Sequence, residues 1–485
     1  MDEVVRGAGT EEFVTAALSR AREAQPGWAA VPVAGRLRLL GRVRRAIAAD
    51  PLALARAVGE RRALAETLSA EVLPLLEAIR FLERRAATLL RPRRLGPRGR
   101  PLWLWGVSAE PWREPCGAVL VLGPGNYPLF LPGTQVVQAL AAGNAVAAKP
   151  APGCTAPMWA LADLLRAAGL PDGVFAVLPD SGAAGAAAVE AGFDRVVLTG
   201  SAATGRHVLQ AAAGRLTPCT MELSGSDPVF VLDGADIALA AASLAYGMRL
   251  NGGATCIAPR KVFVRPEDAG PLERALAARL ADAPAVALPA PVLARLCVLL
   301  AQAQATGARL SGWPGEAATR PILVADARPD LDVLKADIFA PVLSIVPVPD
   351  AQAALAAAAL SPYALGAAIF GPPAAARRLA ERVRAGSVVI NDLIVPTADP
   401  RLPFGGRGES GFGVTRGAEG LLEMTVCKTV LLRQGRFRPH LDARGEDAGA
   451  LTRLISLLHG TTAVRLAALR RMMIRRPEPP ARAGL

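Results

Sequence analysis

The chain has 485 residues, of which 52% are hydrophobic and 20% are charged. This length allows about three domains with a large buried core. No run of about 18 apolar residues is free of charges, so no membrane span is expected. The acidic and polar start MDEVVRGAGTEE lacks the features of a secretory signal.

The net charge of +13 is unevenly spread along the chain. Residues 433–485 contain 11 arginines and 4 acidic residues, which contribute +7 of the total. The basic balance is therefore largely a property of the tail, and nucleic-acid binding by the body is not expected. The six cysteines lie far apart without a CxxC pair, and there are only three histidines. These counts argue against a disulfide framework and a metal site, and they fit a cytoplasmic protein.

Residues 10–90 show apolar side chains at helical spacing, as in RLRLLGRVRRAIAAD. A Pro/Gly/Arg connector follows at 91–101, and the Trp-rich segment 102–112 predicts one or two strands. Short apolar strands then alternate with helices, beginning with the strand at 117–123. The segment TAPMWALADLLRAAGLPDG predicts one of these helices, with Thr155 as its N-cap.

A second series of alternating strands and helices covers residues 228–404. Continuously apolar strands alternating with helices are typical of parallel sheets covered on both faces. Such sheets bind ligands at the carboxyl ends of their strands. The Gly-rich stretch LPFGGRGESGFG at 402–413 then interrupts the pattern.

Three polar side chains stand at strand ends or turns and together suggest acyl transfer. Asn126 lies in GPGNYP, Glu222 in MELSG and Cys256 in NGGATCIAP. A thiol nucleophile, a carboxylate base and an amide that stabilises an oxyanion make a coherent set. Taken singly, each has a simpler interpretation: Cys256 as a core thiol, Glu222 as an ion-paired carboxylate and Asn126 as a turn residue.

A second theme is phosphate binding. The stretch TGSAATG at 199–205 follows a predicted strand and opens a predicted helix, whose N-terminus can attract an anion. It does not match the GxGxxG fingerprint, so an ordinary tight turn is an equally open interpretation at this point.

Several ordered motifs give the chain a resemblance to the aldehyde dehydrogenase family over residues from about 10 to 432. They are GPGNYPL, AAGNAVAAKPA, LTGSAATGRHV, MELSGSDP, NGGATCIAPRKVFV, ADIFAPVLSIV and LPFGGRGESGFG. The chain resembles the shorter, class-3-like branch of the family.

The resemblance implies oxidation of an aldehyde to a carboxylic acid with NAD or NADP. Cys256 would attack the carbonyl, Asn126 would hold the oxyanion, and Glu222 would activate the water that hydrolyses the thioester. The glycines before Cys256 would bring the backbone close to the cofactor and substrate. The cofactor-binding residues implied by the resemblance are Pro124, Lys149, Gly200, Ser201, Gly205, Asp337 and Phe339.

Some positions depart from the family pattern. Asp337 stands where Glu usually holds the nicotinamide ribose, so that contact is expected to be lost or bridged by water. Pro152 stands where NAD-preferring members often carry Glu, which leaves NADP open as a cofactor. Gly125 replaces a common Trp and opens one wall of the site.

The fold class implied is α/β, with a Rossmann-like parallel-sheet nucleotide-binding domain, a second α/β catalytic domain and a small β oligomerisation arm. The expected division is 1–95 and 113–222 for the NAD(P)-binding domain, 223–404 for the catalytic domain, 96–112 and 405–435 for the arm and a Gly-rich segment that covers the site, and 436–485 for a basic amphipathic tail.

Two rival functions stay open from the sequence: a cofactor-independent Cys esterase or hydrolase, and a nucleotide-binding protein with degraded activity. The expected partners are an aldehyde, with a hydrophobic aldehyde as one option, and a second copy of the chain. In the tail, apolar side chains at helical spacing run beside arginines. Such a helix can bind an anionic membrane surface weakly, or it can pack on the protein itself or on a partner subunit. The tail residues are Leu451, Leu454, Ile455, Leu458, Arg465, Leu466, Leu469, Arg470, Arg471, Met473, Arg475 and Arg476.

Overall fold

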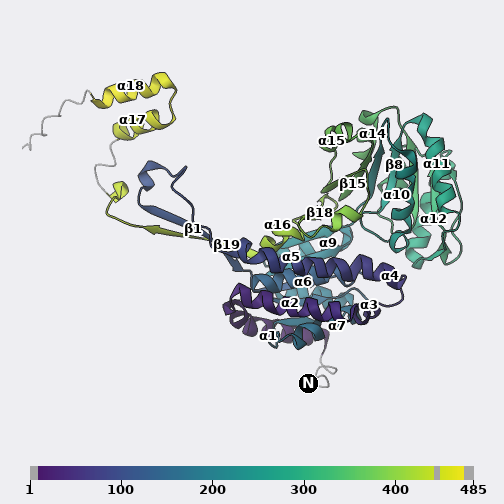
Figure 1. Ribbon diagram of the computed structural model, residues 1–485, viewed down its shortest axis with the longest axis horizontal. Coiled ribbons are helices and arrows are strands. Elements are labelled where there is room, and N and C mark those ends of the chain that lie inside the picture. Colours follow the sequence, from purple (N-terminus) through teal and green to yellow (C-terminus); the bar gives the residue numbers. More distant parts are fainter. Residues whose placement is uncertain (1–8, 442–447, 474–485) are drawn as a thin grey trace, which may run out of the picture. The chain divides into compact units, whose positions relative to one another are not determined.

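The computed structural model describes residues 9–441 and 448–473, which divide into two compact units (Figure 1). The large unit comprises 9–91 and 113–427, and the small unit comprises 92–112 together with the described residues from 428 onward. The tail residues Arg475 and Arg476 lie outside the described residues.

The large unit begins with a layer of helices, as predicted for residues 10–90. Apolar side chains at helical spacing, such as Leu40, Val43 and Ile47, are fully buried and hold this layer against the first sheet. The helix that starts at Leu64 has one wider π turn just before Pro74, whose nitrogen cannot donate a hydrogen bond. The helices of this layer are α2 (Val33–Ala49), α3 (Pro51–Ala57), α4 (Leu64–Thr67), the π turn Leu68–Val72 and α5 (Leu73–Leu90). The preceding helix α1 (Thr10–Ala30) packs mainly on the opposite face of the first sheet, against α8 (Gly182–Ala191) and β3 (Ala145–Lys149).

The first sheet has six strands, five of them parallel. In spatial order they are β18 (Gly411–Phe412), β6 (Cys219–Leu223), β5 (Arg195–Gly200), β2 (Ala118–Leu122), β3 (Ala145–Lys149) and β4 (Phe175–Val177). Both faces are covered, because Val119 and Val121 pack into one core and Leu120 and Leu122 into another. The linking helices are α6 (Phe130–Ala142), α7 (Thr155–Ala167), α8 (Gly182–Ala191) and α9 (Ala202–Ala213).

The second sheet has seven strands and is also mainly parallel. In spatial order they are β10 (Arg309–Leu310), β12 (Ile322–Ala325), β13 (Val342–Pro347), β8 (Pro259–Val264), β7 (Asp227–Val231), β15 (Gly366–Phe370) and β16 (Ser387–Ile390). Its helices are α10 (Ile237–Arg249), α11 (Pro266–Leu280), α12 (Ala290–Ala305), α13 (Asp332–Lys335), α14 (Ala351–Ala358) and α15 (Pro373–Ala380). The predicted architecture of two α/β sheet domains, one of them Rossmann-like, is confirmed.

The Gly-rich segment returns to the first sheet, where β18 pairs antiparallel with β6 so that Gly411 lies opposite Glu222. The remaining short elements of the large unit are β9 (Val286–Ala287) with β11 (Ala318–Thr319), β14 (Tyr363–Ala364) with β17 (Arg407–Gly408), and α16 (Gly417–Glu423). The prediction of Thr155 as N-cap is wrong: Cys154 is the cap residue, and the Thr155 hydroxyl donates to Asp180 at 3.2 Å.

The small unit contains a two-stranded sheet and a helical hairpin. The sheet joins most of β1 (Val107–Pro115) to most of β19 (Thr425–Arg433). In the tail, α17 (Ala448–His459) and α18 (Thr462–Met473) lie side by side (Figure 1). Within the described chain, no helix is long and apolar enough to cross a membrane, and no cluster of side chains is suited to hold a metal. All six cysteines are free.

Candidate active site

A cavity of about 830 Å³ lies in the large unit, where β2, β3, β5 and β6 end. The carboxyl ends of these strands supply Leu122, Lys149, Gly200 and Leu223 to its wall, as expected for a parallel sheet. The cavity brings together nine of the ten residues predicted for the site. They are Pro124, Asn126, Lys149, Gly200, Ser201, Glu222, Cys256, Asp337 and Phe339.

Cys256 follows a turn of unusual backbone conformation. Asn251, Gly252 and Gly253 are all left-handed, with φ of 51°, 60° and 78°. A Cβ on Gly253 would lie 2.6 Å from the nitrogen of Pro341, so only glycine fits there. The sequence predicted that these glycines bring the backbone close to the cofactor and substrate. At Gly253 this reason is wrong, because the close approach is to the backbone of residues 340–341.

The half-buried Cys256 lines the cavity. Burial, followed by the nearby carboxylates of Glu222 and Asp227, raises the pKa of the thiol well above its ordinary range. Arg416 acts in the opposite direction and lowers it. The thiol is therefore protonated at neutral pH in this state, and it needs a base to become a nucleophile.

Glu222 is 2% exposed at the end of β6. Burial raises the pKa of its carboxyl, against the opposing effects of Arg416 and the Thr415 hydroxyl. Thr415 donates to Oε2 at 2.8 Å, whereas Oε1 has no hydrogen-bond partner. A carboxylate with a raised pKa and one free oxygen is suited to act as a general base.

Asn126 stands on the loop after β2, beside the Cys256 turn. Its Nδ2 donates to the carbonyl of Ala254 at 3.0 Å, and its Oδ1 accepts from the backbone N–H of Tyr127. Because a side-chain amide carries two donor hydrogens, this arrangement uses one and leaves one for an oxyanion. A second link joins the two loops, since the hydroxyls of Tyr127 and Thr255 lie 2.7 Å apart.

A buried ion pair anchors the Asn126 loop. Glu71 is fully buried, and its carboxylate accepts from Arg62 at 2.7 Å and from the N–H groups of Leu129 and Phe130 at 2.7 and 3.0 Å. Arg62 in turn donates to the carbonyl of Asn126 at 2.8 Å. The π turn that carries Glu71 thus holds the start of α6 and the loop before it in one position.

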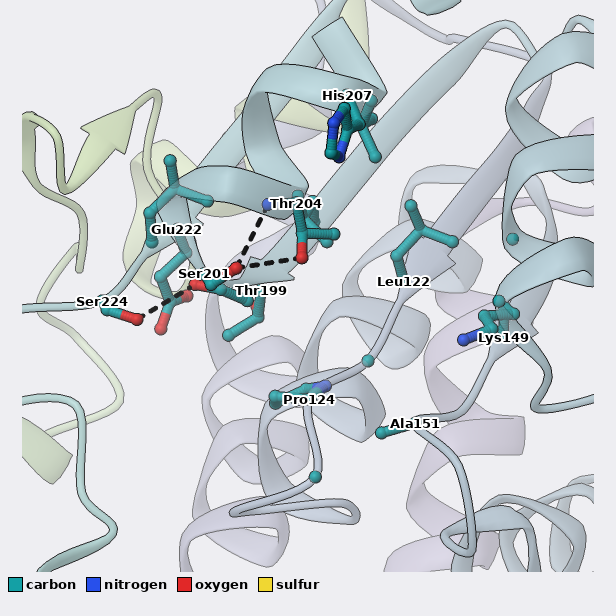
Figure 2. Close-up of a pocket in the computed structure, with 18 of the residues that line it drawn as sticks. Leu122, Pro124, Lys149, Ala151, Thr199, Ser201, Thr204, His207, Glu222 and Ser224 are labelled. Carbon is teal, nitrogen blue, oxygen red and sulfur yellow. Dashed lines mark hydrogen bonds between the residues drawn. The ribbon is translucent and has the colours of Figure 1, made fainter. Parts of the chain in front are cut away.

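The opposite part of the cavity has the features of a nucleotide site. Figure 2 shows Lys149 across the cavity from Ser201, Glu222 and Ser224. Ser201 caps α9 by accepting from the N–H of Thr204 at 3.1 Å, and the N-terminus of this helix faces an anion favourably. Gly205 does not line the cavity, so its predicted contact with the cofactor is not supported. It lies on α9, where a Cβ would come within 2.9 Å of Leu223.

Asp337 provides a direct indication that the cavity accepts a polar ligand. Burial raises the pKa of its carboxyl, and Oδ1 is buried without a hydrogen-bond partner. An orphaned acceptor in a cavity wall suits a hydroxyl donor such as a ribose. The apolar side chains Val189, Val208 and Ala211 supply a flat wall for an aromatic ring. The residues present therefore fit a nicotinamide dinucleotide.

Comparison with known proteins agrees with this site. The family model described as "Aldehyde dehydrogenase family" matches residues 4–430. A probable coniferyl aldehyde dehydrogenase from Pseudomonas aeruginosa is 34% identical over 382 residues, covering 76% of this chain and 79% of that protein. This chain belongs to the aldehyde dehydrogenase family.

Solved structures of the family share the fold. An aldehyde dehydrogenase from Mycobacterium tuberculosis, complexed with NAD+, has a TM-score of 0.81 and 26% identity, covering 88% of this chain and 91% of that one. An NADP-dependent glyceraldehyde-3-phosphate dehydrogenase from Bacillus halodurans, complexed with NADP, has a TM-score of 0.82 and 27% identity, covering 88% and 92%. The resemblance inferred from the motifs is thereby confirmed, while the class-3-like assignment stays a prediction.

Several residues that shape this aldehyde dehydrogenase site were not predicted from the sequence. Tyr127 and Thr255 adjoin predicted residues, so their places near the site could have been inferred, but not the bond between them. Glu71 and Arg62 lie far from any catalytic motif in a plain helical pattern. Thr415 and Arg416 follow the Gly-rich segment without a recognisable signal of their own.

The ion pair should matter for both stability and activity. Glu71→Gln leaves the buried guanidinium of Arg62 uncompensated, which is expected to cost about 3–5 kcal/mol in the free energy of unfolding. Urea denaturation measures it. Glu77→Gln in α5 is the matched control, because the Glu77–Arg80 pair is over 40% exposed and should contribute less than about 1 kcal/mol. Equal losses in the two variants would contradict the anchoring role.

Proposed function

We propose that this chain oxidises an aldehyde to a carboxylic acid with NAD or NADP, through a covalent intermediate on Cys256. The observation that carries the proposal is that Cys256, Glu222 and Asn126 line the same cavity as the nucleotide-binding features around Lys149 and Ser201. A nucleophile, a base and an oxyanion donor in one cavity are the usual parts of an acyl-transfer site.

In the first step the Cys256 sulfur bonds to the aldehyde carbon. The thiol proton is lost to water in the cavity, and the carbonyl oxygen becomes an oxyanion. The free Asn126 amide hydrogen and the Cys256 backbone N–H stabilise that charge. The product of this step is a tetrahedral thiohemiacetal on Cys256.

When bound, the oxidised cofactor supplies a hydride acceptor. Lys149 and Asp337 would hold its ribose hydroxyls, the N-terminus of α9 beside Gly200 and Ser201 would face its phosphates, and Pro124 and Phe339 would border its path. Loss of hydride from the thiohemiacetal carbon turns the tetrahedral centre into a thioester on Cys256.

The second half of the reaction is hydrolysis. Glu222 takes a proton from a water molecule while its oxygen bonds to the thioester carbon. The carbon–sulfur bond then breaks, which releases the carboxylic acid and returns the sulfur to Cys256. The β18 strand pairs with β6 beside Glu222.

Two substitutions separate the half-reactions. Cys256→Ala should abolish dehydrogenase activity while nucleotide binding persists, because only the nucleophile is lost. Glu222→Gln should still give a burst of reduced cofactor and then turn over ~10²–10⁴-fold more slowly, because the base for hydrolysis is missing. Stopped-flow absorbance of the reduced cofactor measures burst and steady state together.

Cys219→Ala is the control for the nucleophile, since Cys219 belongs to β6 but does not line the cavity. Substantial turnover by Cys256→Ala would overturn the assignment, as would an unchanged steady-state rate in Glu222→Gln. Hydrolysis of an ester at full rate without nucleotide would instead favour the rival Cys esterase. Nucleotide binding without turnover of any aldehyde would favour the rival of degraded activity.

Cofactor choice is expected to include NADP. Pro152 lines the cavity near Lys149 and has no carboxylate to repel a 2′-phosphate. Pro152→Glu should lower kcat/KM with NADP and leave that with NAD nearly unchanged; Pro152→Gln is the matched neutral control. A wild-type enzyme that ignores NADP would mean that another residue excludes the phosphate.

The small unit is proposed to mediate contact with a second copy of the chain. It exposes large apolar side chains, among them Trp103, Trp105, Leu431 and Leu432, and the outer edge of β19 pairs with no other described strand. Its tail hairpin is proposed to add a weak, salt-sensitive contact with anionic membranes. Leu451, Ile455, Leu466 and Leu469 are each more than 40% exposed on this hairpin, near the exposed Arg465 and Arg470.

Liposome co-sedimentation tests the tail. The full chain should bind anionic vesicles at low salt and lose them at high salt, whereas a chain ending at Arg433 should bind neither anionic nor neutral vesicles. Size-exclusion chromatography of both proteins gives the oligomeric state in parallel. Equal vesicle binding by both, or none by the full chain, would reject the membrane contact and leave packing on the protein or its partner.

A further inference from the structure

We propose that Arg416 is a positioning residue for the proposed aldehyde oxidation, a buried cation that favours the ionised forms of Glu222 and Cys256 without bonding to either. The proposal rests on the function argued above. Its first observation is the backbone conformation of Arg416, which is unusual for any residue other than glycine.

Arg416 has φ 59° and ψ 176°. This region of backbone conformation is essentially reserved for glycine, because a Cβ is strained there. Glycine occupies the next position, Gly417, which is also left-handed with φ 61°. If the turn needed only a backbone shape, glycine would serve better at 416, so the side chain must contribute something that offsets the strain.

The side chain is buried in an unusual setting for a guanidinium. Arg416 is 6% exposed, with its guanidinium carbon 4.2 Å from the ring centre of Phe404 and 5.6 Å from that of Phe130. Nη1 donates to the carbonyl of Thr397 at 2.9 Å, and Nε has no hydrogen-bond partner. Among the described residues it makes no salt bridge with a carboxylate. A buried cation of this kind needs compensation from charges at longer range.

Glu222 and Cys256 both lie one residue away from Arg416: Thr415, its neighbour in the chain, bonds to Glu222, and Phe404, whose ring it contacts, belongs to the apolar cluster on which Cys256 packs. The charge of Arg416 lowers the pKa of both groups, whereas burial raises it. Arg416 is the charged group that acts on Glu222. Cys256 is also subject to the carboxylates of Glu222 and Asp227, and it interacts with Arg260 and Tyr127. Arg260 is committed elsewhere, since it donates to the carbonyls of Ala340 and Gly253 at 2.6 Å.

An electrostatic effect without a direct bond suits the chemistry of a general base. Thr415 holds Oε2 of Glu222, and a salt bridge from Arg416 would occupy Oε1, the oxygen left to take a proton. A guanidinium that stays outside bonding distance favours the carboxylate while leaving Oε1 open. Consecutive residues thus divide the work: Thr415 orients Glu222, and Arg416 supplies charge.

The pH dependence of thioester hydrolysis tests this division. In Arg416→Gln the pH range over which the steady-state rate rises should move to higher pH, because loss of a nearby cation raises the pKa of Glu222. A shift of about one pH unit would lower the rate about tenfold on the acid side and leave the alkaline plateau nearly unchanged. Arg416→Lys, which keeps the charge, should reverse most of the shift. Arg309→Gln is the matched control, because Arg309 forms exposed ion pairs with Glu273 and Asp326.

A second readout does not require turnover. The rate of Cys256 alkylation by iodoacetamide, followed by mass spectrometry of its peptide, is compared between Glu222→Gln and Glu222→Gln with Arg416→Gln. Both proteins carry a neutral side chain at position 222, so a change in the protonation of Glu222 cannot alter the pKa of the Cys256 thiol in this comparison. Loss of Arg416 should slow alkylation about tenfold on the acid side of the thiol titration. If Arg416→Gln does not fold, Arg416→Gly suits the backbone and replaces it.

Superimposable pH profiles and alkylation rates in folded protein would overturn the role of Arg416, as would a shift that Arg416→Lys fails to restore. Failure of the proposed function looks different: wild-type protein would oxidise no aldehyde, whereas the alkylation comparison would still report whether Arg416 acts on Cys256.

Discussion

The site depends on the hydrogen bonds that join two loops from different sheets. The Asn126 loop follows β2 of the first sheet, and the Cys256 turn precedes β8 of the second. The bond from Asn126 Nδ2 to the Ala254 carbonyl and the Tyr127–Thr255 hydroxyl pair connect them, with the Glu71–Arg62 ion pair behind. This connection holds the oxyanion donor and the nucleophile together although they come from different sheets.

A second constraint is electrostatic. Burial of Cys256 and Glu222 strengthens each charge interaction, and it also penalises the ionised forms that the chemistry requires. The protein surrounds the pair with few compensating groups: a hydroxyl on Glu222, an amide at the oxyanion position and the unpaired guanidinium of Arg416. Positive φ angles appear at both places where this is arranged: at Asn251–Gly253, where these residue types tolerate them, and at Arg416, where a side chain is strained.

Much of the fold could be predicted from the sequence, because apolar strands that alternate with helices indicate both mainly parallel sheets. Local motifs at strand ends likewise located Asn126, Glu222 and Cys256, and the cavity holds all three. What sequence could not predict are contacts between distant segments: Glu71 reaches the start of α6 across 58 residues, and Arg416 reaches the site by packing between Phe130 and Phe404. The predicted cofactor contact of Gly205 is not supported, because a glycine needed for packing a helix on a strand has the same local sequence pattern as one that borders a phosphate.

The central claim is that oxidation proceeds through an acyl group on Cys256 that Glu222 removes. Its most direct test is the intact mass of Glu222→Gln protein after mixing with an aldehyde and NAD or NADP. The account predicts a mass increase equal to the acyl group of that aldehyde, located on the Cys256 peptide and absent without nucleotide. Formation of the carboxylic acid with no adduct at Cys256, or an adduct on another cysteine, would contradict it.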